Sequence, residues 1–180
     1  MPKLNADFKQ QIKQLQKPTL EEIVMKLASK DQKVFDFLMV NYLDKENGEQ
    51  DLFDKARENL DVMFTKRYKG YAEEQKMAHK IAACSKRVTE FAAASKNKKL
   101  EADLLMYILK NTFDKDLLAS HFETYDNKCA TLVRKVISIL TTKLHSDYII
   151  EYQDKINYYL KFLYDRSSHL GVVCELPEEI

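Results

Sequence analysis

Glycine and proline are nearly absent from this chain, since only three of each occur among 180 residues. Both residues break helices, and glycine supplies the tight turns on which phosphate-binding loops and nucleophile elbows depend. The motifs GxGxxG, GxxxxGKS/T and GxSxG are accordingly absent from the sequence. We therefore expect an all-α protein with few places for strands or for the loops of common nucleotide-binding and hydrolase folds.

Apolar residues recur along most of the chain at the three- and four-residue spacing of amphipathic helices. The clearest stripe has the spacing 4-3-4-3 and consists of Met77, Ile81, Cys84, Val88 and Phe91. Connections between successive stripes are roughly two to eight residues long, as is typical of neighbouring antiparallel helices. We expect roughly seven to nine antiparallel helices, arranged as stacked helical hairpins in an irregular superhelix or as a single multi-helix bundle. The unequal helix lengths and the width of several stripes favour the stacked hairpins.

The beginning of the chain is predicted to be a polar N-terminal arm of residues 1–18, which ends at Pro18. Directly behind it, Thr19 and Glu22 have the spacing of a capping box, in which each side chain accepts a hydrogen bond from the other residue's backbone amide. Asp31 is placed to cap the next helix.

The remainder of the chain, residues 19–170, is expected to form a single helical domain. Within this domain, Asp114 can cap a short helical segment over residues 117–122. Gly171 then ends the regular pattern. The tail of residues 171–180 contains one proline and three acidic residues, and we expect it to be loose or to lie along the surface.

The composition is that of a soluble globular protein, because 45% of the residues are hydrophobic, 32% are charged and the net charge is +1. The uninterrupted apolar runs are much shorter than a helix that crosses a bilayer. The first residues have neither the apolar segment nor the cleavage site of a signal peptide. We therefore expect a cytoplasmic protein with no membrane partner.

Residue types that commonly carry chemistry do not form a recognisable site in the sequence. None of the four histidines has another histidine or a cysteine three or four residues away, which a helical metal site needs. His121 and Glu123 are two residues apart, and side chains at that spacing do not face each other on a helix. We therefore expect no catalytic residue, no metal site and no cofactor, and we interpret the chain as not an enzyme.

Two of the three cysteines differ in their predicted setting. Cys84 lies on an apolar stripe, where a small buried thiol is the ordinary occupant. Cys129 is predicted at the beginning of a helix and follows Lys128, and this placement can lower the pKa of a thiol. Cys129 is thus the strongest candidate for a reactive cysteine, with core packing as the more common alternative role.

Charge is distributed unevenly, with ten basic and three acidic residues between positions 66 and 99. Six of the cations could form a ridge that contacts phosphates or a protein partner: Lys69, Lys76, Lys80, Arg87, Lys98 and Lys99. Tyr68 and Tyr71 are available to stack on bases. The alternative interpretation is a solvated polar face opposite the apolar stripe from Met77 to Phe91.

Tyrosine is frequent, and five of the ten tyrosines fall in the last long helix. Aromatic side chains are enriched at protein interfaces, and Tyr158 and Tyr164 are the candidates for such a contact. The alternative is packing at the boundary of the core, where a chain without tryptophan commonly uses tyrosine.

Three stretches show a characteristic arrangement of apolar and charged positions: HKIAACSKRVTEF (79–91), KKLEADLLMYILKN (98–111) and HFETYDNKCATLVRKVISIL (121–140). They resemble the body of a bacterial all-helical family of unknown function. The segment KPTLEEIVMKLASKDQKVFDFL (17–38) is similar to the beginning of that family, whereas SSHLGVV (167–173) is less aromatic than its usual ending. The resemblance implies an all-helical fold and a bacterial source, and it carries over no functional residue.

The function that the sequence favours is that of a non-catalytic helical protein-interaction module. Such a scaffold or adaptor would present a helix-lined surface to a protein partner or to a second copy of itself. The alternative is a nucleic-acid-binding helical protein that uses the basic segment 66–99. An enzyme with a helix-borne site is the third candidate.

Overall fold

The computed structural model describes residues 3–115, 122–167 and 169–180. In these residues all regular structure is helical, which confirms the predicted all-α fold. A π-helical turn, η1 (Met39–Leu43), follows the third helix. The α-helices are α1 (Ala6–Gln14), α2 (Lys17–Lys30), α3 (Gln32–Leu38), α4 (Gly48–Thr65), α5 (Glu73–Ala94), α6 (Lys98–Phe113), α7 (Glu123–Lys143), α8 (Asp147–Arg166) and α9 (Leu170–Val173).

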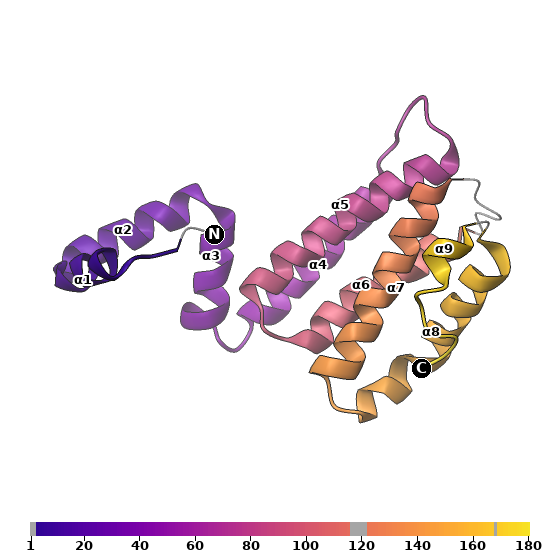
Figure 1. Ribbon diagram of the computed structural model, residues 1–180. Coiled ribbons are helices and arrows are strands. Elements are labelled where there is room, and N and C mark those ends of the chain that lie inside the picture. Colours follow the sequence, from indigo (N-terminus) through magenta and orange to yellow (C-terminus); the bar gives the residue numbers. More distant parts are fainter. Residues whose placement is uncertain (1–2, 116–121, 168) are drawn as a thin grey trace.

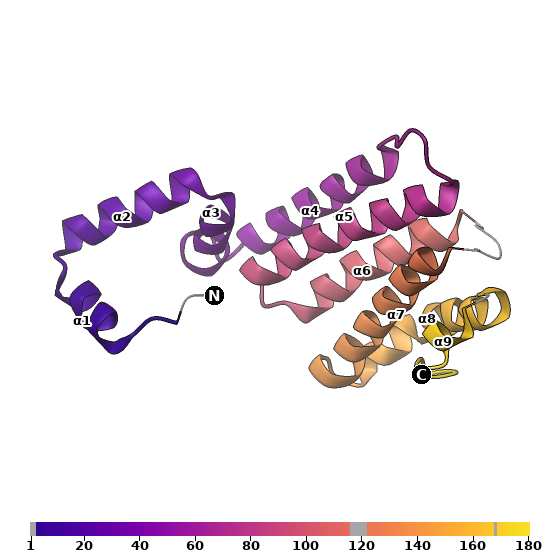
Figure 2. The ribbon, with the colours of Figure 1, turned by 45° about the horizontal axis from the view of Figure 1, so that its top comes forward.

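Helices α4 to α8 form a single bundle in which successive helices run in opposite directions (Figure 1). Figure 2 shows α4, α5, α6 and α7 side by side. Helices α5 and α6 lie at its centre, because each of them contacts α4 and α7 as well as the other. Helices α8 and α9 pack against α7. The structure therefore has the bundle and not the stacked hairpins that the sequence favoured.

The core of the bundle is built from one apolar stripe on each helix. Each helix from α4 to α8 contributes a side chain that is at most 1% exposed: Leu60, Ile81, Leu105, Val133 and Ile156. The stripe that the sequence predicted from Met77 to Phe91 faces this core, and all five of its members are buried. Burial of these stripes against one another is what holds the helices together.

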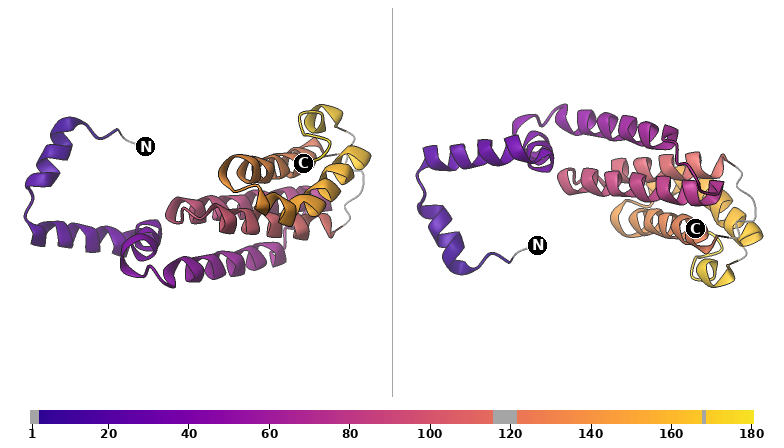
Figure 3. Two further views of the ribbon diagram at one scale, coloured as in Figure 1. Left: turned by 90° about the horizontal axis from the view of Figure 1, so that it is seen from below. Right: turned by 90° about the horizontal axis from the view of Figure 1, so that it is seen from above.

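The N-terminal helices lie outside the bundle (Figure 3). Helix α3 contacts α5 and η1 contacts α4, whereas α1 and α2 extend away from the bundle. The side-chain amide of Asn41 in η1 donates a hydrogen bond of 2.9 Å to the backbone oxygen of Ala94, at the end of α5. No residue from α1 to η1 is buried.

The start of α2 differs from the predicted capping box. The helix begins at Lys17 and has Pro18 in its first turn, so Thr19 lies inside the helix rather than at its cap. Proline is favoured in the first turn because its missing N–H would have no helical partner there. Asp31 caps α3 as predicted, since its carboxylate accepts a hydrogen bond of 2.9 Å from the amide two residues on. Helix α2, which the sequence assigned to the domain of residues 19–170, extends away from the bundle together with α1.

The C-terminal tail of residues 171–180 is packed, contrary to the expectation that it is loose. Val173 and Leu176 are buried in the main core. At the end of the chain, the backbone N–H of Ile180 donates a hydrogen bond of 2.9 Å to Oδ1 of Asn157 on α8. These apolar contacts outweigh the proline and the acidic residues on which the expectation rested.

The short segment that the sequence predicted over residues 117–122 falls almost entirely on residues 116–121, which lie outside the described residues. Asp114 is the residue that ends α6, and its backbone N–H donates a hydrogen bond of 2.9 Å to the carbonyl of Lys110. Its role as the cap of a following helix stays a prediction.

Candidate functional site

Neither of the two cysteines discussed above is activated in the structure. Helix α7 begins at Glu123, so Cys129 lies in its second turn and is buried there. Burial raises the pKa of the Cys129 thiol to about 12, and it also raises the pKa of Cys84 to about 12. A thiol with such a pKa is protonated at neutral pH and is a poor nucleophile. Both side chains therefore act as core residues.

The structure contains a buried polar cluster that the sequence did not indicate. Asp126 on α7 is 3% exposed, and its Oδ2 accepts a hydrogen bond of 2.7 Å from the Ser167 hydroxyl. The same oxygen lies 2.8 Å from Nδ1 of His169. The Ser167 hydroxyl in turn accepts a hydrogen bond of 3.1 Å from the His169 backbone N–H. The three residues thus join α7 to the segment that follows α8.

A hollow of about 500 Å³ lies beside this cluster, between α7 and the C-terminal segment. Arg134 and Glu175 form an ion pair of 2.9 Å at its wall. The Ser167 hydroxyl donates to Asp126 and not to the imidazole, and these hydrogen bonds anchor the segment that follows α8 to α7. Among the described residues, no three His, Cys, Asp or Glu side chains are grouped so that they could hold a metal ion.

The predicted basic ridge on α5 is occupied by contacts within the chain. Nζ of Lys76 lies 2.7 Å from Glu73, and Arg87 lies 2.7 Å from Glu90, each one helical turn away. Nζ of Lys80 donates a hydrogen bond of 2.5 Å to a backbone oxygen near the end of α4. These cations already have acceptors, which reduces what they offer to phosphates.

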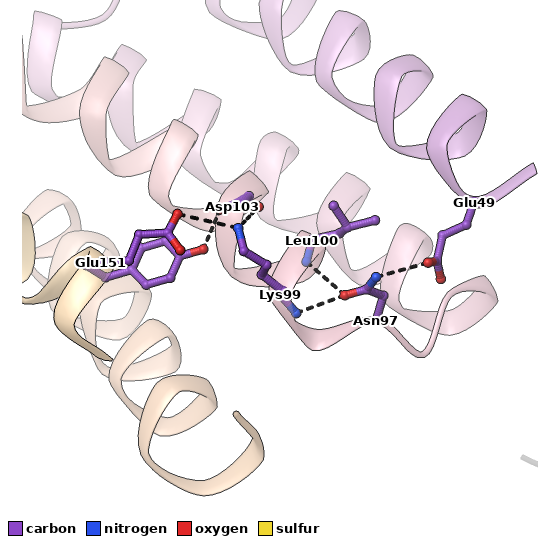
Figure 4. A network of polar contacts seen from close by, with 7 residues as sticks. Glu49, Asn97, Lys99, Leu100, Asp103 and Glu151 are labelled. Atoms are coloured by element: carbon purple, nitrogen blue, oxygen red, sulfur yellow. Dashed lines mark hydrogen bonds and ion pairs between the residues drawn. The ribbon is translucent and has the colours of Figure 1, made fainter. Parts of the chain in front are cut away.

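Lys98 and Lys99, at the start of α6, both lie close to carboxylates, and Figure 4 shows the contacts of Lys99. Nζ of Lys99 lies 3.3 Å from Asp103 on the same helix and 3.4 Å from Glu151 on α8. Nζ of Lys98 lies 2.6 Å from the buried carboxylate of Glu101. Lys99 thus links α6 to α8, whereas Lys98 pairs within α6, and both lysines already have acceptors.

Asn97 caps α6 and also ties this helix to α4 (Figure 4). Its Oδ1 accepts hydrogen bonds from the backbone N–H groups of Lys99 and Leu100, at 3.1 and 3.2 Å. Its Nδ2 donates a hydrogen bond of 3.0 Å to Glu49 on α4. The Ser95 hydroxyl donates to the other oxygen of Glu49 at 2.6 Å. The turn between α5 and α6, which lies in the basic segment 66–99, is thus a junction of helices.

The loop between α4 and α5 contains the remaining cation of the ridge, Lys69, which is exposed. The next residue, Gly70, has a φ of +77°, a left-handed conformation that favours glycine. The rings of Tyr68 and Tyr71 pack against His79 on α5, with centroid distances of 5.6 and 5.2 Å. The rings that were expected to stack on bases therefore already contact a ring of the protein.

The two candidate interface tyrosines on α8 have different surroundings. Tyr158 is 58% exposed, and its ring lies at the edge of the Tyr159 ring. Tyr164 is half-buried, and its hydroxyl donates a hydrogen bond of 2.6 Å to the backbone oxygen of Leu176. Tyr164 therefore holds the C-terminal tail, and of the two only Tyr158 presents most of its ring to solvent.

An open groove of about 530 Å³ lies between α4, α6 and α8. The Arg57 guanidinium lies over the Tyr107 ring at 4.9 Å, and the Tyr107 hydroxyl donates a hydrogen bond to Asp61. Burial and a hydrogen bond to Asp103 raise the pKa of Tyr152. The groove is lined by three cations and three carboxylates, so it does not select a ligand by charge: Arg57, Lys110, Lys155, Asp103, Asp114 and Glu151.

The N-terminal helices carry most of the uncovered apolar side chains. Eleven of the sixteen exposed large hydrophobic residues in the described part of the chain precede residue 44. We call residues 3–30 the arm, and seven of the eleven belong to it: Leu4, Phe8, Ile12, Ile23, Val24, Met25 and Leu27. Exposed apolar patches are typical of interaction sites, and Ile23, Val24 and Leu27 share one stripe of α2.

No protein-family model, curated protein or solved structure matches this chain, so we interpret its surfaces from their own geometry. Among the helices that the structure describes, none combines the length and the apolar character that crossing a membrane requires. Of the surfaces above, the apolar face of the arm is the strongest candidate for a functional site.

Proposed function

We propose that this protein is a non-catalytic helical interaction module whose arm binds a protein partner. The observation that supports the proposal is that α1 and α2 are amphipathic and yet contain no buried residue. An amphipathic helix in a protein gains most of its stability by packing its apolar face. We therefore expect this face to be covered by another molecule.

The length of the two helices supports the same conclusion. Helix α1 has 9 residues and α2 has 14 residues. Isolated helices shorter than about 12–15 residues are marginal in water. Each large apolar side chain contributes about 1.5–3 kcal/mol when it becomes fully buried. A partner that covers the face would thus stabilise both helices, whereas solvent leaves them prone to fraying.

Helix α3 holds the arm at a defined place on the bundle. Lys33 on α3 lies 3.5 Å from Glu90 on α5, and Asp36 lies 3.8 Å from Lys55 on α4. The hydrogen bond from Asn41 to α5 adds a third link. This attachment presents α1 and α2 as a projecting hook (Figure 1), which is an arrangement suited to binding.

The other predicted surfaces contribute less to the proposal. Five of the six candidate cations are bonded to carboxylates or to a backbone oxygen within the chain. This weakens the alternative of a nucleic-acid-binding protein that uses the segment 66–99. Tyr158 is one exposed ring, whereas the arm presents seven large apolar side chains that are 36–65% exposed.

The proposal is tested by immobilising the full-length chain and two variants and measuring which proteins each of them retains from a cell lysate. Val24→Glu combined with Leu27→Glu places charge in the centre of the apolar face. Ser29→Glu adds the same residue on the opposite face of α2 and serves as the matched control. We expect bound proteins, including free copies of this chain, to be retained by wild type and control but not by the double variant. Equal retention on all three, or none on any, would contradict the proposal.

A further inference from the structure

The apolar stripe of α2 has the same spacing when it is read from either end. It consists of Leu20, Ile23, Val24 and Leu27, with the spacing 3-1-3. The four positions fall within about 100° of one another, because each helical residue advances the direction by about 100°. A two-fold axis between antiparallel α2 helices would place Leu20 against Leu27 and Ile23 against Val24. An interface between identical subunits requires this kind of self-complementary surface.

The charged residues beside the stripe fit the same register. A two-fold axis across an antiparallel pair keeps each flank of one helix next to the same flank of the other. Lys17 would then lie near Asp31 at the end of the partner helix, which places opposite charges together. On the other flank, Lys30 would lie opposite the neutral side chains of Gln16 and Thr19. Within α2, this register places no two like charges face to face.

The exposed apolar side chains of the arm offer further surface for the contact. Six of them are 36–55% exposed, whereas Met25, at about 140° from Leu20, lies off the stripe of α2. A standard protein interface buries about 800 Å² on each partner, so residues beside the stripe must contribute to the contact as well.

We infer that the partner of the arm is a second copy of this chain. Two chains associate with their α2 helices antiparallel, about a two-fold axis near Ile23 and Val24. This inference rests on the proposed function and extends it by naming the molecule that covers the apolar face.

The first test is the molar mass from sedimentation over a series of protein concentrations. The single chain has a mass of 21.1 kDa. We expect twice this mass at high concentration, with dissociation on dilution. The Val24→Glu, Leu27→Glu variant is expected to stay monomeric, whereas Ser29→Glu is expected to dimerise like wild type. Thermal unfolding of the bundle should be the same in all monomeric samples, because the arm contains no buried residue.

The second test is disulfide formation between copies, which reports the register. Cys174→Ser removes the exposed thiol and leaves two buried cysteines. In that background, Val24→Cys is expected to give a covalent dimer on mild oxidation, because both copies of position 24 lie beside the axis. Leu20→Cys alone is not expected to give a covalent dimer, since the two copies of position 20 lie roughly 10 Å apart along the helices. Leu20→Cys combined with Leu27→Cys should form the dimer again.

A monomeric mass at every concentration, or a dimer that is unaffected by the double glutamate variant and not cross-linked at position 24, would overturn the inference. Retention of a different protein by the arm of a monomeric chain would overturn the inference and leave the proposed function intact. Binding of the arm to phosphatidylserine vesicles, with no protein retained, would overturn both.

Discussion

Glu101 shows how a charged side chain is kept inside the bundle. It is 4% exposed on α6, and its carboxylate lies 2.6 Å from Lys98 and 3.1 Å from Lys135 on α7. Burial by itself raises the pKa of this carboxyl, but the hydrogen bonds from the two lysines outweigh burial and hold the pKa below its usual range. The carboxylate is therefore charged at neutral pH and links α6 to α7.

We predict that Glu101→Ala lowers the free energy of unfolding by about 1.5–3 kcal/mol at pH 7, because it removes two hydrogen bonds to charged groups. Folding lowers the pKa of the Glu101 carboxyl. The contribution of Glu101 to stability is therefore present at pH values above its unfolded pKa of about 4.3, and it is lost as the pH falls through the folded pKa. Urea unfolding at several pH values measures it. The control is Glu21→Ala, which breaks an exposed pair with Lys17 at 3.7 Å and should cost less than about 1 kcal/mol. Equal losses in both variants would contradict the assignment.

The three cysteines should differ in their reaction with a thiol reagent. Cys174 is exposed, whereas Cys84 and Cys129 are buried and have pKa values raised to about 12. We predict rapid modification of one thiol in the native protein at pH 8 and of all three after unfolding in urea. Fast native modification of Cys129 would show that it is activated after all.

At the level of single residues, the sequence indicated the role of Cys84 but not that of Asp126. An apolar stripe identifies a buried thiol by its position alone. The partners of Asp126 are 41 and 43 residues away, and no short-range pattern reports such a contact. The one signal was that Asp126 lies among core-facing residues of its helix, where a carboxyl needs partners.

Matched leucines on two helices distinguish the bundle from the arm. Leu60 on α4 is fully buried, whereas Leu27 on α2 is 52% exposed. We predict that Leu60→Ala lowers the free energy of unfolding by about 2–5 kcal/mol, because it leaves a cavity in the core. Leu27→Ala should change it by less than about 0.5 kcal/mol at protein concentrations where the chain is monomeric. Urea unfolding of both variants under the same conditions checks this, and a similar loss in both would show that the arm is packed on its own bundle.

Removal of the C-terminal tail should destabilise the bundle. Deletion of residues 171–180 takes away the buried side chains of Val173 and Leu176. The expected loss in free energy of unfolding is about 3–6 kcal/mol for two large apolar side chains. Glu178→Ala, at an exposed position of the same tail, is the control and should have no measurable effect. An unchanged stability after deletion would support the original expectation of a loose tail.

Helix positions were predictable from the sequence where a long stripe repeats, as from Met77 to Phe91. The beginning of α2 was not, because Pro18 and the residue pair Thr19 and Glu22 gave competing signals for the first turn. The packing of the C-terminal tail was not predictable either. Its proline and acidic residues are local signals, whereas its packing depends on contacts with α7 and α8.

For the whole molecule, the sequence left open whether the helices form a bundle or a superhelix. Helices with apolar stripes of the same width occur in both arrangements. Which arrangement forms depends on contacts between helices that are distant in the chain, such as α5 with α7. The sequence also did not show that α2 lies outside the bundle. Its stripe has the same spacing as a buried one, and its partner is, by our inference, in another molecule.

Hydrogen exchange of the α2 amides tests most directly whether the arm is covered by a second copy of the chain. The amides of α6, in the buried centre of the same bundle, provide the internal control. We predict that the amides of residues 17–30 exchange quickly in dilute protein and more slowly as the concentration rises, while exchange in α6 stays constant. Equally fast exchange of residues 17–30 at every concentration would contradict the account.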